Sequence, residues 1–432
     1  MISNRLAAAL ARRNIHYGWV MVGVTFLAAL IAAGTVGAPG VFIVPLQREF
    51  GWTTAEISSA LSIRFMLFGL MAPFAAALLN RYGLRNVTLL AQLIVISALV
   101  ASLAMTKVWQ LMLLWGVVIG IGTGMTAAVL GATIATRWFV ARRGLVVGIL
   151  SASVATGQLL FLPLLASLTE RFGWRIALSL ICAMLAVSAC LVLLLMGDRP
   201  SDLGLRPFGD SGTEPLPAPP PATAPIIAAA LGTLRDAAKT RVFWILFATF
   251  FICGASTNGL IQVHLIPMCL DFGIPQVQAA SLLAAMGVFD FAGTIASGWL
   301  SDRYDNRWLL FWYYGLRGLS LVALPFSDFS FYGLSLFALF YGLDWIATVP
   351  PTVRLTAQRF GPERANLVFG WVFAGHQLGA GAAAFGAGLS RTVYASYLPA
   401  FFIAGALCVF AALIVLALSR QPKPAVALAA SR

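Results

Sequence analysis

The feature that most limits how this chain can fold is a series of long apolar stretches separated by short polar segments. Windows of about 20 residues, the length that a helix needs to cross a bilayer, identify twelve such stretches. They cover residues 17–44, 55–79, 87–106, 109–135, 145–168, 176–196, 242–268, 275–300, 308–326, 331–356, 366–392 and 394–418. We therefore expect an all-α membrane protein with twelve transmembrane helices.

The composition supports the lipid bilayer as the main solvent of this chain. Only 10% of the residues are charged, 60% are apolar, and the mean hydropathy is +0.90. Soluble domains carry charge on about a quarter of their residues. The net charge of +13 would suit nucleic acid, but the basic residues lie in short segments between apolar stretches, where they determine membrane topology. We expect a lipid partner and no nucleic acid.

The basic residues also predict an orientation. Most of the 28 lysines and arginines lie in the segments on the amino-terminal side of the alternation, such as those with Arg12, Arg81 and Arg359. Because cytoplasmic loops carry an excess of basic residues, both termini are expected in the cytoplasm. The interpretation is a multi-pass protein of the bacterial inner (plasma) membrane.

The two halves of the chain resemble each other at one constant offset. Pro45 corresponds to Pro267, and short basic loops after the second and fourth stretches recur after the eighth and tenth. If the matched loops of the two halves lie on the same side of the membrane, each half must contain an even number of helices. We therefore expect two six-helix bundles related by a pseudo-two-fold axis. The expected domains are residues 1–197, a Pro-rich and Gly-rich cytoplasmic linker at 198–241, residues 242–420, and a cytoplasmic tail at 421–432.

The repeated loops carry a known motif. Asn80-Arg81-Tyr82-Gly83-Leu84-Arg85 and Asp302-Arg303-Tyr304 resemble the loop signature of the major facilitator superfamily, with Asn80 and Asp305 at positions where that family has Asp and Gly. The resemblance covers the whole chain and implies transport by alternating access. It also implies a gating role for charged residues of the cytoplasmic loops, here Arg81, Arg85, Asp302, Arg303, Arg142 and Arg364.

Further motifs look like the monocarboxylate-porter branch of that superfamily. They are His16-Tyr17-Gly18-Trp19, Trp138-Phe139 with Arg142-Arg143-Gly144, Phe172-Gly173-Trp174-Arg175, and His264 to Pro267 with Asp271 to Gly273. Bacterial members of this branch carry lactate, oxalate and other small organic anions, often together with a proton. The resemblance therefore implies a small organic anion and protons as partners.

Five ionisable residues lie near the middle of apolar stretches. A charge at this depth is costly unless it is paired or hydrated, so each is a candidate functional residue. The five residues are Arg64, Asp290, Arg317, Asp344 and His376.

Two of these positions bear on which residue could bind the carboxylate of a substrate. In the monocarboxylate branch, an Asp at the position of Asp290 is followed one turn later by an Arg that binds the substrate carboxylate, but this chain has Thr294 there. Arg64 can supply the missing cation, because a guanidinium binds a carboxylate through two parallel hydrogen bonds. The alternative for Arg64 is a structural ion pair with Asp290 or Asp344, and a structural ion pair is the favoured interpretation of Arg317.

The remaining candidates lie on the last six stretches. His376 and Gln377 lie midway along the eleventh stretch, which lines the cavity in the superfamily, and Asn258 is a weaker polar candidate on the seventh. Asp344 is either a proton site or the partner of an arginine, and Pro350-Pro351 is expected to bend the tenth stretch near its cytoplasmic end. We interpret Asp290, Asp344 and His376 as proton-coupling candidates, and Arg64, His376, Gln377, Asn258 and Thr294 as substrate-binding candidates.

These features favour a secondary active transporter over other functions. The five cysteines have no CxxC spacing and are interpreted as small apolar residues, so no metal site is predicted. No nucleotide-binding motif, nucleophile–base arrangement or obligate protein partner is evident, so we expect neither an enzyme nor a cofactor. The leading hypothesis is proton-linked transport of a small organic anion, a carboxylate; the alternatives are an exporter or antiporter of larger amphipathic compounds and a non-transporting membrane sensor.

Overall fold

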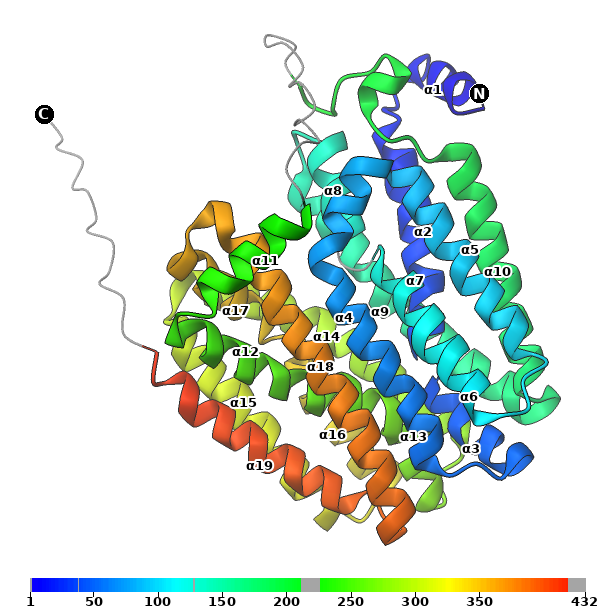
Figure 1. Ribbon diagram of the computed structural model, residues 1–432, viewed down its shortest axis with the longest axis vertical. Coiled ribbons are helices and arrows are strands. Elements are labelled where there is room, and N and C mark those ends of the chain that lie inside the picture. Colours follow the sequence, from blue (N-terminus) through cyan, green and yellow to red (C-terminus); the bar gives the residue numbers. More distant parts are fainter. Residues whose placement is uncertain (1, 38, 127–128, 211–225, 419–432) are drawn as a thin grey trace, which may run out of the picture.

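The computed structural model describes residues 2–37, 39–126, 129–210 and 226–418. The middle of the expected linker and the expected tail at 421–432 lie outside these residues. Within them the chain is almost entirely helical, and the one β-bridge joins Phe139 to Phe208. Figure 1 shows the helices of the first half on the right and those of the second half on the left, with the short amino-terminal helix α1 (Ile2–Ala11) at one end.

The first half contains long helices, several of which are divided. They are α2 (Gly18–Gly37) with α3 (Pro39–Phe50), α4 (Thr54–Tyr82), α5 (Leu84–Ser102), α6 (Val108–Leu111) with the π-helix η1 (Met112–Val118), α7 (Ile119–Gly124) and α8 (Val129–Trp138), α9 (Arg143–Phe172) and α10 (Trp174–Leu195). Short turns separate successive helices of the first half. At two of these turns, Gly83 (φ 89°) and Gly173 (φ 83°) adopt a positive φ, which residues with a side chain rarely do.

The second half repeats this plan after a short connecting helix. The 3-10 helix η2 (Pro200–Leu203) and α11 (Ile226–Ala237) precede it. Its helices are α12 (Arg241–Gly254) with the π-helix η3 (Ala255–Ile261) and α13 (Gln262–Asp271), α14 (Gln276–Arg303), α15 (Asn306–Ala323) with the 3-10 helix η4 (Leu324–Phe326), α16 (Phe331–Asp344) with α17 (Val349–Phe360), α18 (Pro362–Tyr394) and α19 (Leu398–Val415).

The structure supports eleven of the twelve expected membrane spans. Eleven helices or helix combinations among the described residues are long and apolar enough to cross a membrane, so the count of twelve is not confirmed. The helix that is not among them is α18, which has 33 residues. Its middle is rich in Gly and Ala and contains His376 and Gln377, whose polarity lowers the mean hydropathy of the helix.

Helices α4 and α18 form the main contact between the halves. Small residues let their backbones approach closely: a Cβ on Gly381 would lie 2.9 Å from the carbonyl oxygen of Ser62, and one on Gly69 would lie 2.4 Å from the Cβ of Gln377. Phe68 of α4 also meets Phe373 of α18, with 6.1 Å between ring centroids. The two helices therefore join the halves along much of their length.

The halves also meet at the end of the molecule opposite α1. Gln276 Nε2 donates to Val41 O across 2.8 Å, and Ala55 N donates to Thr392 Oγ1 across 3.1 Å. A Cβ on Gly40 of α3 would lie only 2.9 Å from Val263 O of α13. This end of the interface is closed, with backbone against backbone.

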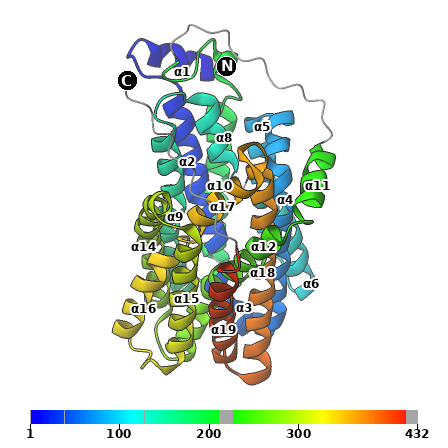
Figure 2. The same ribbon diagram turned by 90° about the vertical axis from the view of Figure 1, so that its left-hand side faces the viewer.

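The start of the expected linker packs against motif residues of the first half. Phe208 lies beside His16, Trp19 and Phe139, with ring centroids 5.6, 5.9 and 5.8 Å away. Its backbone N donates to Trp138 O across 2.8 Å. The HYGW and WF motifs and Phe208 of the linker therefore meet in one aromatic group near α1, which lies at the top of the view in Figure 2.

We predict that Gly379→Leu destabilises the protein, because a Cβ at Gly379 would lie 1.9 Å from Phe251 O of α12. Overpacking of this kind costs roughly 1–3 kcal/mol, so the midpoint of thermal unfolding in detergent should fall. Gly386→Leu on the same helix is the matched control, since no atom lies within 4 Å of its added Cβ. Equal midpoints for the two variants would contradict this packing.

A second prediction concerns the closed end. A leucine at Gly40 has no room beside Val263 O, so Gly40→Leu should hold this end apart. Spin labels at the exposed positions Arg48 and Gln278 should then report a distance longer by several ångströms than in the parent protein. Gly23→Leu, where a Cβ meets no atom within 4 Å, should leave the distance unchanged; an unchanged distance in Gly40→Leu would show that the contact does not control closure.

Candidate functional site

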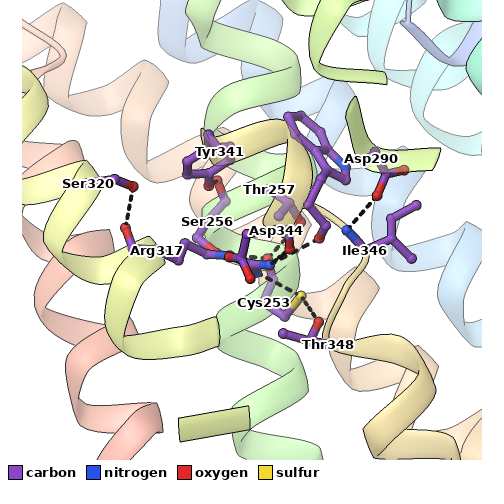
Figure 3. A network of polar contacts seen from close by, with 11 residues as sticks. Cys253, Ser256, Thr257, Asp290, Arg317, Ser320, Tyr341, Asp344, Ile346 and Thr348 are labelled. Carbon is purple, nitrogen blue, oxygen red and sulfur yellow. Dashed lines mark hydrogen bonds and ion pairs between the residues drawn. The ribbon is translucent and has the colours of Figure 1, made fainter. Parts of the chain in front are cut away.

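The second half buries an arginine at its centre. Arg317 of α15 is 1% exposed, and its Nε donates to Asp344 Oδ2 across 2.7 Å. A buried charge needs an opposite charge and further hydrogen bonds to be stable. The ion pair expected for Arg317 is therefore formed with Asp344, at the end of α16 (Figure 3).

Cys253 of α12 joins this ion pair. Its Sγ lies 3.1 Å from Arg317 Nη1 and 3.2 Å from Thr348 Oγ1. The interpretation of the cysteines as apolar residues is wrong for Cys253, because its thiol contacts a guanidinium and a hydroxyl group. Sequence reasoning missed it, since a lone cysteine in an apolar stretch gives no sign of a charged partner on another helix.

A second carboxylate lies close to this group. Asp290 of α14 accepts hydrogen bonds at Oδ1 from Ile346 N across 2.8 Å and from Thr294 Oγ1 across 3.1 Å. Asp290 and Thr294 lie one turn apart on the same face of the helix, as their spacing predicts. We refer to Cys253, Asp290, Arg317 and Asp344 together as the polar cluster.

His376 of α18 borders the polar cluster. Its ring stacks on Phe373 with 5.8 Å between centroids and an interplanar angle of 5°, and it lies 4.9 Å from the ring of Phe250. It also interacts with the thiol of Cys253. Among the described residues, its buried Nδ1 has no hydrogen-bond partner.

The other polar candidates of the second half are Gln377 and Asn258. Gln377 turns toward the first half, where its side chain packs on Gly69 of α4. It is 2% exposed, and within the described part of the chain its Oε1 finds no donor. Asn258 is half-buried in η3 on the seventh span.

Arg64 lies inside the first half and is not brought together with His376. It is 4% exposed, and its guanidinium carbon lies 5.6 Å from the ring centroid of Phe65. The side chain lines a cavity of about 10 Å³, the space of about one water molecule. The cavity walls come from α2, α3, α5, η1, α7 and α10, namely Thr35, Pro39, Phe42, Leu99, Trp115, Ile119, Leu178 and Ile181.

The acids that were considered as partners of Arg64 bond elsewhere. Asp344 pairs with Arg317, and Asp290 accepts from Ile346 N and Thr294. One of the two alternatives for Arg64 was an ion pair with Asp290 or Asp344. Among the described residues, neither acid forms an ion pair with Arg64.

The gating candidates of the first half contact residues of that half and of the adjoining linker. Arg81 lies over the ring of Tyr82, 5.4 Å from its centroid. Arg85 donates from its backbone N to Asp198 Oδ1 across 2.9 Å and from Nη2 to Leu193 O, so it connects the start of α5 to the end of α10.

The first half also contains a contact at Asn80, the position where the superfamily motif has Asp. Arg137 Nη2 donates to Asn80 Oδ1. The neutral amide of Asn80 therefore occupies the place of the motif carboxylate. Arg142, another gating candidate, precedes the first residue of α9, has a positive φ of 62° and lies over Phe208 of the linker.

In the second half, the motif acid pairs with an arginine that sequence reasoning missed. Arg354 of α17 forms an ion pair with Asp302 at the end of α14. Arg303 instead lies over Trp299, 4.0 Å from its ring centroid. The signal for Arg354 was its place beside the basic residues at the end of the tenth stretch, but its pairing with Asp302 depends on the angle between α14 and α17.

The Asp302–Arg354 pair lines an opening at the end of the molecule that carries the repeated basic loops. The opening has a volume of about 650 Å³ and is lined by Gly298, Ser301, Asp302, Pro350, Val353 and Arg354. It therefore lies between the ends of α14 and α17.

The last gating candidate, Arg364, is exposed at the start of α18. The hydrogen bond from Lys239 lowers the pKa of Asp236 on α11, and the positive charge of Arg364 lowers it further. Trp371 Nε1 of α18 also donates to Ala230 O of α11 across 2.9 Å. Helix α11, which lies within the expected linker, is thus attached to α18 at this end.

Comparisons with known proteins agree with this architecture. A family model described as Major Facilitator Superfamily matches residues 25–384 and, in a second match, 265–432. The chain is 24% identical over 398 residues to an uncharacterized MFS-type transporter, YcxA of Bacillus subtilis, covering 90% of this chain and 91% of that protein. It is 27% identical over 397 residues to monocarboxylate transporter 13 of Bos taurus, covering 90% and 86%.

Solved structures share the fold at low sequence identity. The nucleoside transporter NupG aligns with a TM-score of 0.73 and 12% identity over 93% of this chain and 99% of that chain. A D-xylose-proton symporter aligns with a TM-score of 0.70 and 14% identity over 92% and 97%. Both share the arrangement of two helical bundles. From the family match, the relatives and the fold together, the chain belongs to the major facilitator superfamily and is a multi-pass membrane transporter, not an enzyme.

Proposed function

We propose that this transporter carries a small organic anion, a carboxylate, by alternating access coupled to protons. The relatives named monocarboxylate transporters support the substrate class. The buried carboxylates of the second half support the coupling. The two halves meet along α4 and α18 and at the α3–α13 end, and a transporter built from two such halves can work by rocking one half against the other.

The observation that carries the proposal is the charge balance of the polar cluster. It contains one arginine, Arg317, and two carboxyl side chains, Asp290 and Asp344, all buried or nearly so. With both carboxylates ionised, the cluster has an excess negative charge in a low-dielectric region, which is costly. Binding one proton removes the excess. Other titratable side chains that interact with these charges are Cys253, Tyr313, Tyr314, Tyr341 and Cys408, and His376 interacts with Cys253.

For the anion we propose contacts from both halves. His376, with its unsatisfied Nδ1, and Gln377 lie on α18, next to the first half. Asn258 and Thr294 are half-buried on the seventh and eighth spans. Arg64 is the deeply buried cation on the first-half side of α4, and we propose that it engages the carboxylate when the first half rearranges during the cycle. A guanidinium suits this role because it binds a carboxylate through two hydrogen bonds.

We further propose that the protein lies in the bacterial inner membrane with both termini in the cytoplasm. The distribution of basic residues supports this orientation. The opening beside Arg354 then faces the cytoplasm. In the described conformation Asp302 pairs with Arg354, and Arg303 lies over Trp299, both within the second half. Arg81 lies over Tyr82 of the first half, and Arg85 and Arg142 contact Asp198 and Phe208 of the linker. We propose that these gating residues exchange partners when that side closes.

We predict that purified protein in liposomes accumulates a radiolabelled carboxylate when the outside is made acidic. Protonation of the polar cluster on the acidic side balances the charge of the entering anion, and deprotonation inside releases the proton. Uptake is measured with and without a protonophore, with protein-free liposomes as the control. Failure of every mono-, di- and aromatic carboxylate tested to respond to the gradient would contradict proton-coupled carboxylate transport.

We also predict that Arg64→Ala abolishes this uptake. Loss of a charged hydrogen-bond partner costs about 2–5 kcal/mol, so uptake at low substrate concentration should fall by about 30-fold or more. Arg64→Lys keeps the positive charge but loses the planar guanidinium that binds a carboxylate through two hydrogen bonds, so it should retain part of the activity. Arg171→Ala is the control because Arg171 is exposed. A correctly folded Arg64→Ala variant with unchanged uptake would remove Arg64 from the substrate site.

A further inference from the structure

The tenth span is broken in the middle of the second half. Helix α16 ends at Asp344 and α17 begins at Val349, with residues 345–348 in a tight turn. Pro350 and Pro351 cause the break, because a proline has no N–H to donate to the carbonyl four residues earlier. The turn instead uses shorter bonds: Trp345 N donates to Gly342 O across 3.0 Å, and Val349 N donates to Ile346 O across 2.8 Å.

The shorter bonds free backbone carbonyls on the α16 side. Since Val349 N bonds to Ile346 O, Trp345 O lacks its helical donor. Arg317 Nη2 donates to Trp345 O across 3.1 Å and also to Asp344 O. The guanidinium thus satisfies two carbonyls at the end of α16, where a positive charge also interacts favourably with the helix dipole.

The α17 side of the break is satisfied from α14. Gly342 O accepts from Trp345 N, whereas Ile346 N donates to Asp290 Oδ1 across 2.8 Å. Ala347 O, freed by the prolines, accepts from Ser297 Oγ across 2.5 Å. Asp290 and Ser297 lie two turns apart on one face of α14.

We propose that Arg317 and Asp290 are positioning residues that hold the break of the tenth span, so that α17 can move as one body relative to α16. Inside a bilayer a free N–H or C=O costs several kcal/mol, and these two side chains satisfy such groups from opposite sides of the turn (Figure 3). Arg354 of α17 lines the 650 Å³ opening, so the turn is the pivot of that wall.

This role is independent of the solute carried and of proton coupling. Asp290 therefore has a structural task besides the proton binding proposed above. The two tasks need different chemistry: an amide oxygen can accept the hydrogen bond from Ile346 N, but an amide cannot bind a proton near neutral pH.

The test compares Asp290→Ala with Asp290→Asn in the full-length protein, using hydrogen–deuterium exchange of residues 343–348. Asp290→Ala should raise the exchange rate of the Ile346 amide by about tenfold or more, because a hydrogen bond to a charged group contributes about 1.5–3 kcal/mol. Asp290→Asn should keep most of the protection, since its amide oxygen replaces the carboxylate oxygen as acceptor. Exchange in α5 serves as the control for global folding.

A second variant tests Arg317. Replacing Arg317 alone leaves Asp344 as an unpaired buried charge, so the pair is replaced together, Arg317→Met with Asp344→Leu. The folded double variant should exchange faster at residues 345–348. Native-like exchange in this variant, or in Asp290→Ala, would overturn the positioning role.

The outcomes for the two proposals are separable. If uptake never responds to a proton gradient while Asp290→Ala loosens the turn, the pivot stands and the proposed coupling fails. If Asp290→Asn loses the response to the gradient but keeps the protection of Ile346, both proposals stand. If Asp290→Ala keeps full protection, the pivot fails whatever the transport result.

Discussion

The structure of the second half depends on satisfying backbone polar groups where no water is available. A regular helix does this by itself, but Pro350 and Pro351 make it impossible in the tenth span. Arg317 and Asp290 satisfy the groups that become free at the turn between α16 and α17. The buried charges of Arg317 and Asp290 therefore satisfy backbone groups at a local break in a helix. This is a structural role that needs no ligand.

Close packing of glycines is the second constraint. Gly293 of α14 packs on Leu343 O just before the break, and Gly254 of α12 packs on His376 O. A Cβ at either position would lie 1.8 Å from the carbonyl oxygen. Such contacts place the backbones of neighbouring helices side by side and bring Cys253 and His376 to the same polar cluster. Close packing at glycines also joins the halves along α4 and α18. These two helices must slide against each other if the halves rock.

The candidate site is divided between the halves in the conformation described. The polar cluster and His376 belong to the second half, and Arg64 belongs to the first, where it faces a small cavity between its own helices. This division suits a carrier in which proton binding and anion binding are separate events linked by movement of the halves. If Arg64 and His376 bind one ligand, as proposed, movement of the halves must bring them together.

The sequence by itself determined the helical membrane architecture, the repeat of the loops and the family, because hydropathy and short motifs are local properties of the chain. It also indicated the bend at Pro350 and the acid at Asp290. The partners of the deep charges were decided only by the tertiary structure: the pairing of Arg317 with Asp344, the contact with Cys253 and the enclosure of Arg64 depend on which faces of separate helices meet. Hydropathy does not record the angle at which two apolar helices cross, and that angle selects the partners.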